Sequence, residues 1–195
     1  MRGWLLRAAT VALVVLLAGL LGGCGSSGPV VTYDGIGASY CLSPQTQRTQ
    51  DGFTVGVGTV ADSASSPVTF TSVKAVGARG TALVDAVIVP YKGGDAVGTG
   101  GGVASAPHNE AASLVPQLWK QRRFIPGAVL PAKGSPKAFQ GWQVVFGIRR
   151  LGTSRAVLKS AKLTYRIGSR TYSLVVAVNV TYAPLTDTSR GGCPQ

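Results

Sequence analysis

The strongest structural signal in this chain is a strand–turn–strand pattern over residues 162–182. In its first half, Leu163, Tyr165 and Ile167 alternate with polar residues, and a Gly-Ser dipeptide follows at 168–169. Alternation with a period of two places the two sets of side chains on opposite faces of a strand. A two-residue connection that begins with glycine is typical of a β-hairpin. The pattern therefore predicts two paired antiparallel strands.

Further strand signals occur upstream of this hairpin. Alternating or apolar runs lie at residues 53–57, 68–71, 82–89 and 142–148. Ser72 interrupts the alternation of the second run, which predicts a β-bulge there. Because strands separated by turns dominate and no βαβ alternation occurs, we expect an all-β protein. The predicted architecture is an antiparallel, immunoglobulin-like β-sandwich with at most one short helix.

Two segments interrupt the strand pattern. Residues 92–112 contain six glycines and are expected to form a long glycine-rich loop. Residues 113–124 are expected to form the short helix, with three basic residues near its carboxyl end and Trp119 in the core.

The first 23 residues have the form of a secretory signal peptide. Arg2 and Arg7 supply positive charge, and residues 8–21 are mostly apolar, which is shorter than a typical membrane span. The apolar run ends at Leu21-Gly22-Gly23-Cys24. The alternative is an uncleaved signal anchor, since residues 4–23 have the minimal length for a tilted span.

The sequence Leu21-Gly22-Gly23-Cys24 resembles the lipobox of bacterial lipoproteins. This resemblance implies cleavage before Cys24 and a thioether from its thiol to diacylglycerol. Segments 67–91 and 124–131 also resemble parts of uncharacterised envelope lipoproteins of high-GC Gram-positive bacteria, which imply no activity and no site residues. The expected location is the extracytoplasmic face of the cell membrane, where two or three acyl chains give stable anchorage.

We therefore expect a signal peptide over residues 1–23, the lipidated Cys24 with a short tether over 24–38, and one β-sandwich domain over 39–195. Cys41 and Cys193 lie near the two ends of that domain. In an oxidising compartment, two such cysteines are expected to form a disulfide bond. The alternative is a thiol pair for redox or metal chemistry, but no CxxC motif is present.

The formal net charge is +12, and it is unevenly distributed. Residues 24–112 hold four basic and six acidic residues, whereas residues 113–195 hold thirteen basic residues and one acid. A positive field attracts anions, so we expect lipid headgroups, an anionic envelope polymer or another envelope protein as partner. Export separates the domain from cytoplasmic nucleic acid. The candidate anion-binding surface consists of Lys120, Arg122, Arg123, Arg149, Arg150 and Arg155. The alternative is a solvated basic face that only aids solubility.

Several motifs of catalytic or cofactor sites occur only in incomplete form. Residues 56–61 match a relaxed GxGxxA fingerprint but lead into another strand, so no dinucleotide site is expected. Ser154 lies in a near-GxSxG sequence, but the only histidine, His108, precedes it, unlike in nucleophile-elbow hydrolases. Asp85 is either a functional carboxylate or an edge or hydrogen-bonded aspartate. We expect no catalytic residue, no metal site and no cofactor.

These observations favour a membrane-anchored, extracytoplasmic lipoprotein that acts as a non-enzymatic binding module in the cell envelope. One alternative is a carrier of a lipid or other apolar ligand, with residues 119–130 at the lip of a cavity between the sheets. A second alternative is an envelope hydrolase.

Overall fold

A computed structural model describes residues 31–33, 39–44, 52–91, 99–101, 116–135 and 141–186. The chain divides into two compact units, Met1–Val30 and Val31–Gln195, and every described residue belongs to the second. This unit begins inside the stretch 24–38 that the sequence assigned to the tether, because Val31–Tyr33 already forms a strand of a sheet. No helix in the described ranges is long and apolar enough to cross a membrane.

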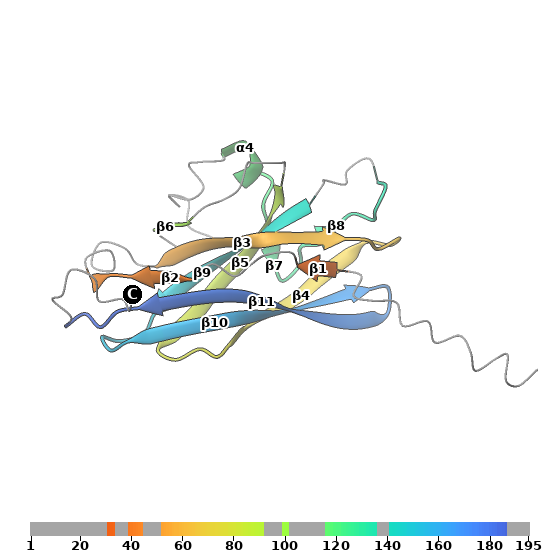
Figure 1. The fold of residues 1–195 in the computed structure, drawn as a ribbon. Helices are drawn as coiled ribbons and strands as arrows, with labels where there is room; N and C mark the ends of the chain where they lie inside the picture. Colours follow the sequence, from red (N-terminus) through yellow and green to blue (C-terminus); the bar gives the residue numbers. More distant parts are fainter. Residues whose placement is uncertain are drawn as a thin grey trace, which may run out of the picture. The chain divides into compact units, whose positions relative to one another are not determined.

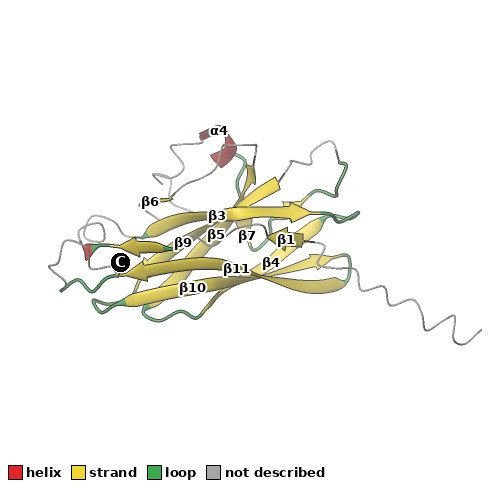
Figure 2. Ribbon diagram, in the orientation of Figure 1, coloured by secondary structure: helices red, strands yellow, loops and turns green. Residues whose placement is uncertain are grey.

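Two β-sheets make up this unit, and strands dominate it (Figures 1 and 2). The strands of the six-stranded sheet are β1 (Val31–Tyr33), β3 (Phe53–Asp62), β5 (Thr81–Tyr91), β6 (Thr99–Gly101), β7 (Arg123–Ile125) and β9 (Gly141–Arg150). Their order is β1-β3-β9-β5-β7, and β6 also pairs with β3.

The second sheet has five strands in the order β2-β11-β10-β4-β8. These strands are β2 (Tyr40–Leu42), β4 (Val68–Val76), β8 (Val129–Leu130), β10 (Ala156–Ile167) and β11 (Arg170–Tyr182). Among the described strands, β2 and β11 form the one parallel pair, and every other pair is antiparallel. The predicted all-β sandwich is confirmed, whereas its immunoglobulin-like identity stays a prediction.

The hairpin predicted from the alternation is confirmed as β10 and β11. Ile167 pairs with Arg170, and Gly168 between them has a φ of 57°. Glycine adopts this left-handed conformation without the steric penalty of a Cβ atom. The predicted bulge next to Ser72 is also present, because Thr164 pairs with Ser72 whereas Tyr165 pairs with Phe70.

The main core lies between the two sheets. Alternate residues of β10 and β11 are buried against the six-stranded sheet, where β11 contacts β3 and β10 contacts β5. Within this core, the rings of Phe70 and Tyr165 have centroids 5.7 Å apart. Burying each such large apolar side chain stabilises the fold by about 1.5–3 kcal/mol. The period-two pattern of the sequence is therefore the pattern that packs the sandwich.

A second, smaller core covers the outer side of the six-stranded sheet. The short helix α4 (Pro116–Trp119) places Trp119, which is 7% exposed, against Val87, Val89 and Val145. This layer explains why β9 is buried on both faces over residues 141–148. The expectation that Trp119 is buried is correct, but it packs outside the sandwich and not between the sheets.

Two local expectations hold only in part. Within the predicted helix 113–124, α4 ends at Trp119, and residues 123–125 form strand β7 because they pair with β5. Within the predicted glycine-rich loop 92–112, Thr99–Gly101 forms strand β6 against β3. The remainder of that loop lies outside the described residues.

Candidate functional site

The outer face of the five-stranded sheet carries an unusual concentration of positive charge. Along β10, Leu163 and Tyr165 point into the core, so Lys162 and Arg166 point to solvent on the opposite face. We call the whole set the cationic sheet face. Its basic residues, all exposed, are Lys74, Lys159, Lys162 and Arg166. Within the described strands of this sheet, every charged residue is Lys or Arg.

Two of these lysines lie directly opposite each other on neighbouring strands. Lys162 of β10 pairs in register with Lys74 of β4 and, on its other side, with Val175 of β11. Residues opposite one another in a sheet share a face, and like charges in this position are destabilising. The fold therefore tolerates a repulsion that an acidic residue at either position would relieve.

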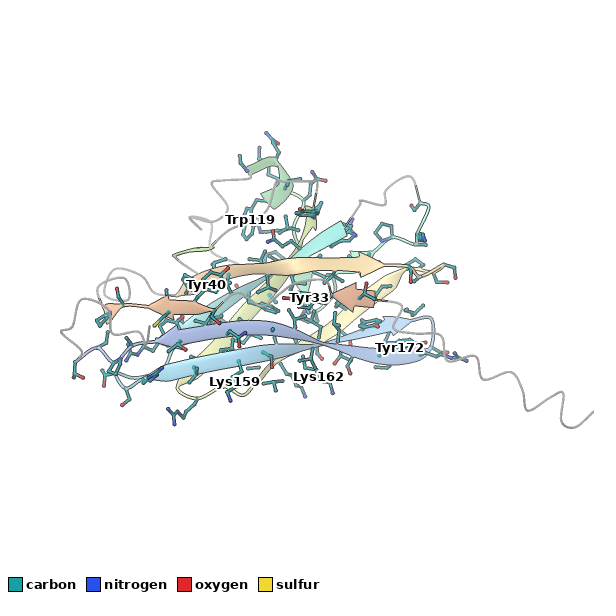
Figure 3. The ribbon with its side chains drawn as sticks, viewed as in Figure 1. Tyr33, Tyr40, Trp119, Lys159, Lys162 and Tyr172 are labelled. Atoms are coloured by element: carbon teal, nitrogen blue, oxygen red, sulfur yellow. The ribbon has the colours of Figure 1, made fainter. Side chains whose placement is uncertain are left out.

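Lys159 extends the same charged region toward the end of β4. A Cβ atom added to Gly77 would meet the Cβ and Cδ atoms of Lys159 at 3.1 Å, so the stem of Lys159 passes over the glycine backbone. Figure 3 shows Lys159 and Lys162 on the side of β10 away from β3, whereas Trp119 lies on the opposite side of the sandwich.

Apart from Val76 and Val175, small side chains occupy the remaining outward positions of the central strands. These positions hold Thr69, Ser72, Ser160, Thr164, Thr171, Ser173 and Ala177. Because these side chains are short, the lysines and arginines stand above them and reach a partner first. The arrangement can hold an extended anionic surface by many weak contacts.

The basic surface that the sequence suggested is not assembled as one patch. On β5, the partner of Arg123 is Ile88 and the partner of Arg149 is Ala82. These positions lie roughly 20 Å apart along the strand, at about 3.3 Å per residue. Lys120, Arg122 and Arg123 therefore form one group, and Arg149, Arg150 and Arg155 belong to the far end of the sheet.

Arg150 has a structural role. Its Nη1 donates to the carbonyl oxygen of Ala183 at 3.0 Å, and its Nη2 donates to the carbonyl oxygens of Ser154, at 2.7 Å, and Thr153. Burial lowers the pKa of Arg150, and it raises the pKa of the neighbouring Tyr182 well above its usual value, an effect that the Arg150 charge opposes. Arg150 thus fastens the turn between β9 and β10, and it is not a free surface cation.

Arg122 and Arg123 are also engaged within the fold. The guanidinium of Arg122 lies over the rings of Trp119 and Phe124, at 5.2 and 5.5 Å, and its Nη1 donates to the Trp119 carbonyl oxygen. Arg123 lies 4.8 Å over the ring of Trp142 and donates to the carbonyl oxygen of Val129. Of the six predicted residues, Lys120, Arg149 and Arg155 are the exposed ones.

A pocket of about 390 Å³ borders the cationic sheet face, and its lining includes Tyr40, Lys159, Asn179 and Thr181. Asn179 has a φ of 47°, and the pairing of β10 with β11 shifts register beside it. Asparagine tolerates this left-handed conformation better than most residues. The lining comes from β2, β10 and β11, so the pocket differs from the predicted cavity between the sheets with residues 119–130 at its lip.

The incomplete motifs occupy strands and turns. Residues 56–61 lie within β3, so their glycines open no helix. Ser154 lies in the exposed turn between β9 and β10, and Asp85 lies on β5 beside a register shift. His108 falls outside the described residues. Within the described ranges, no three His, Cys, Asp or Glu residues gather as metal ligands would.

Of the three cysteines of the chain, Cys41 lies within the described residues. Cys41 lies on β2, whereas Cys193 lies outside the described residues. The pairing with Cys193 therefore stays a prediction. Cys24 also lies outside the described residues, and lipidation there stays a prediction.

The sequence contained the signal for the cationic sheet face in the alternation of residues 162–167. Lys162 and Arg166 occupy the polar positions of that strand, but Lys74 joins them only through the pairing of β4 with β10. No known protein family, curated protein or solved structure matches this chain.

Proposed function

We propose that this chain is a lipid-anchored, non-enzymatic binding module on the extracytoplasmic face of the cell membrane. Its cationic sheet face binds an anionic component of the envelope. The observation that carries this proposal is the presence of four exposed cations on one sheet face whose described strands contain no acid. The anchor is inferred from the lipobox-like sequence that ends at Cys24.

Charge complementarity gives the proposal its energetic basis. Each Lys or Arg close to an anionic surface contributes about 1 kcal/mol, and the contribution falls with ionic strength. Several cations on one face therefore act together, although each contact alone is weak. The lysine repulsion between Lys74 and Lys162 is relieved when an anion binds between them.

The other hypotheses have weaker support. A carrier needs an enclosed apolar pocket, whereas the pocket beside the cationic sheet face includes Lys159, Asn179 and Thr181 in its lining. A hydrolase needs a nucleophile with a positioned base, and Ser154 lies in an exposed turn. The binding module is therefore the function that the described residues support best.

The test compares two triple variants of the full-length lipidated protein, held in non-ionic detergent. One is Lys74→Glu/Lys162→Glu/Arg166→Glu on the cationic sheet face. The matched control is Lys120→Glu/Lys133→Glu/Arg155→Glu, which changes the same net charge at exposed positions elsewhere. The salt concentration that elutes each protein from phosphocellulose is measured.

We expect the face variant to elute at much lower salt than the wild type, while the control stays close to the wild type. Local charge density, and not net charge, would then determine the binding. Equal shifts of the two variants would refute the proposal.

A further inference from the structure

We propose that the partner of the cationic sheet face is an anionic phospholipid surface, and that Val175 and Val76 enter its headgroup layer. This inference rests on the proposed function and names the partner of the same site. It predicts that the five-stranded sheet lies against the membrane, with α4 on the side that faces away.

The first argument is the position of two exposed valines among the cations. Val175 is 57% exposed and lies directly opposite Lys162, while Val76 is 42% exposed and lies opposite Ser160 in the neighbouring row. A valine that faces water on a sheet surface loses the transfer free energy that burial would supply. Both valines therefore gain from a partner that has an apolar layer.

The second argument is the combination of chemistries on one face. A phospholipid headgroup layer presents phosphate charge directly above hydrocarbon, so it satisfies lysine ammonium groups and valine methyl groups together. Lysine stems can lie along the apolar boundary while their charged ends reach the phosphates. A hydrated anionic polymer matches the charges but leaves Val175 and Val76 in water.

The third argument is the length of chain between the expected anchor and the sandwich. Six residues separate Cys24 from the start of β1 at Val31, and the seven steps from Cys24 to Val31 span at most about 25 Å when fully extended. A domain held this close meets the membrane surface at high effective concentration. Weak contacts of a few residues are then enough to dock it.

The experiment places a fluorescent reporter on the face of the full-length lipidated protein, reconstituted in vesicles. Val175→Trp puts an indole beside Lys162, and quenching by brominated phosphatidylglycerol reports its contact with the bilayer. The matched control is Leu151→Trp, because Leu151 is 56% exposed and lies in the turn after β9, off the cationic sheet face. Both proteins carry the same lipid anchor.

We expect strong quenching of Val175→Trp on brominated phosphatidylglycerol, little on brominated phosphatidylcholine, and little for Leu151→Trp on either lipid. Adding Lys162→Gln to the Val175→Trp protein should lower the ratio of membrane-docked to undocked protein roughly fivefold. This change corresponds to the loss of about 1 kcal/mol for one basic residue. Because Lys162 is exposed, this change leaves the core intact.

Absence of quenching for Val175→Trp would overturn the lipid inference. If the face variant still elutes early from phosphocellulose, the proposed function survives and its partner is another polyanion. If both results are negative, the proposed function fails as well. Equal quenching of Val175→Trp and Leu151→Trp would also overturn the inference, because the anchor alone would then explain the contact.

Discussion

Two neighbouring side chains, Arg150 at the end of β9 and Tyr182 at the end of β11, are partly or fully buried, unlike the exposed lysines of the surface. The Tyr182 hydroxyl donates to the carbonyl oxygen of Ile148 at 3.2 Å, and the Arg150 guanidinium binds three carbonyl oxygens close by. Because a planar guanidinium carries several donors in a fixed geometry, one arginine can fasten a whole turn. The role of each arginine therefore depends on its surroundings and not on its charge.

At this scale, Tyr182 predicts a loss of stability at alkaline pH. Its pKa in the folded state lies well above the ordinary value, mainly because the phenol is buried. Above about pH 10 the unfolded chain releases the phenol proton while the folded chain keeps it, so the free energy of unfolding falls. This contribution is fully present below pH 10 and decreases by about 1.4 kcal/mol per pH unit above it.

The measurement is urea unfolding of the wild type and of Tyr182→Phe from about pH 9 to 12. The wild type should lose stability more steeply than the variant above about pH 10. At about pH 9, before this loss begins, the variant should be less stable by about 1 kcal/mol, because the Ile148 carbonyl loses the Tyr182 hydroxyl as a donor. Parallel curves above pH 10 would show that Tyr182 ionises normally in the folded protein.

At the scale of elements, local sequence patterns predict the long strands correctly, but they overestimate the length of the helix. Alternating residues 162–182 form a hairpin because each residue has a nearby partner strand. The helical pattern over 113–124 fails after Trp119, because Arg123, Phe124 and Ile125 pair with β5. Sheet hydrogen bonds to a strand far away in sequence thus override a weak helical propensity.

The element-scale prediction concerns the docking of α4. Trp119→Ala should reduce the free energy of unfolding by about 3 kcal/mol, because it empties the small core on Val87, Val89 and Val145. The neighbouring Phe124 is 46% exposed, so Phe124→Ala should reduce it by about 1 kcal/mol or less. Chemical denaturation measures both. Similar losses for the two variants would mean that α4 does not depend on Trp119 for its packing.

At the scale of the whole molecule, the positive charge is concentrated on one sheet. The two acidic residues of the described ranges, Asp62 and Asp85, lie on the six-stranded sheet, whereas the five-stranded sheet carries only basic residues in its described strands. Like charges so close together reduce stability.

The whole-molecule prediction is that one substitution raises the free energy of unfolding and weakens binding to an anionic partner. Lys162→Glu places a carboxylate opposite Lys74, so at low salt it should raise the free energy of unfolding by about 0.5 kcal/mol. The same variant should elute from phosphocellulose at lower salt than the wild type. Urea unfolding at low and high salt checks the first effect. A variant that is both less stable and unchanged in binding would contradict the role given to this pair.

The sequence by itself determined the long strands β3, β4, β5, β9, β10 and β11, the hairpin turn at Gly168, the bulge near Ser72 and the β-sandwich class. The patterns that indicate these strands and turns lie in residues close together in the chain. Only the tertiary structure decided which cations share a surface. Lys74 and Lys162 lie opposite each other because β4 pairs with β10. By contrast, contacts with aromatic rings and carbonyl groups hold Arg122, Arg123 and Arg150 within the fold. Such contacts join residues distant in the sequence, so no local pattern encodes them.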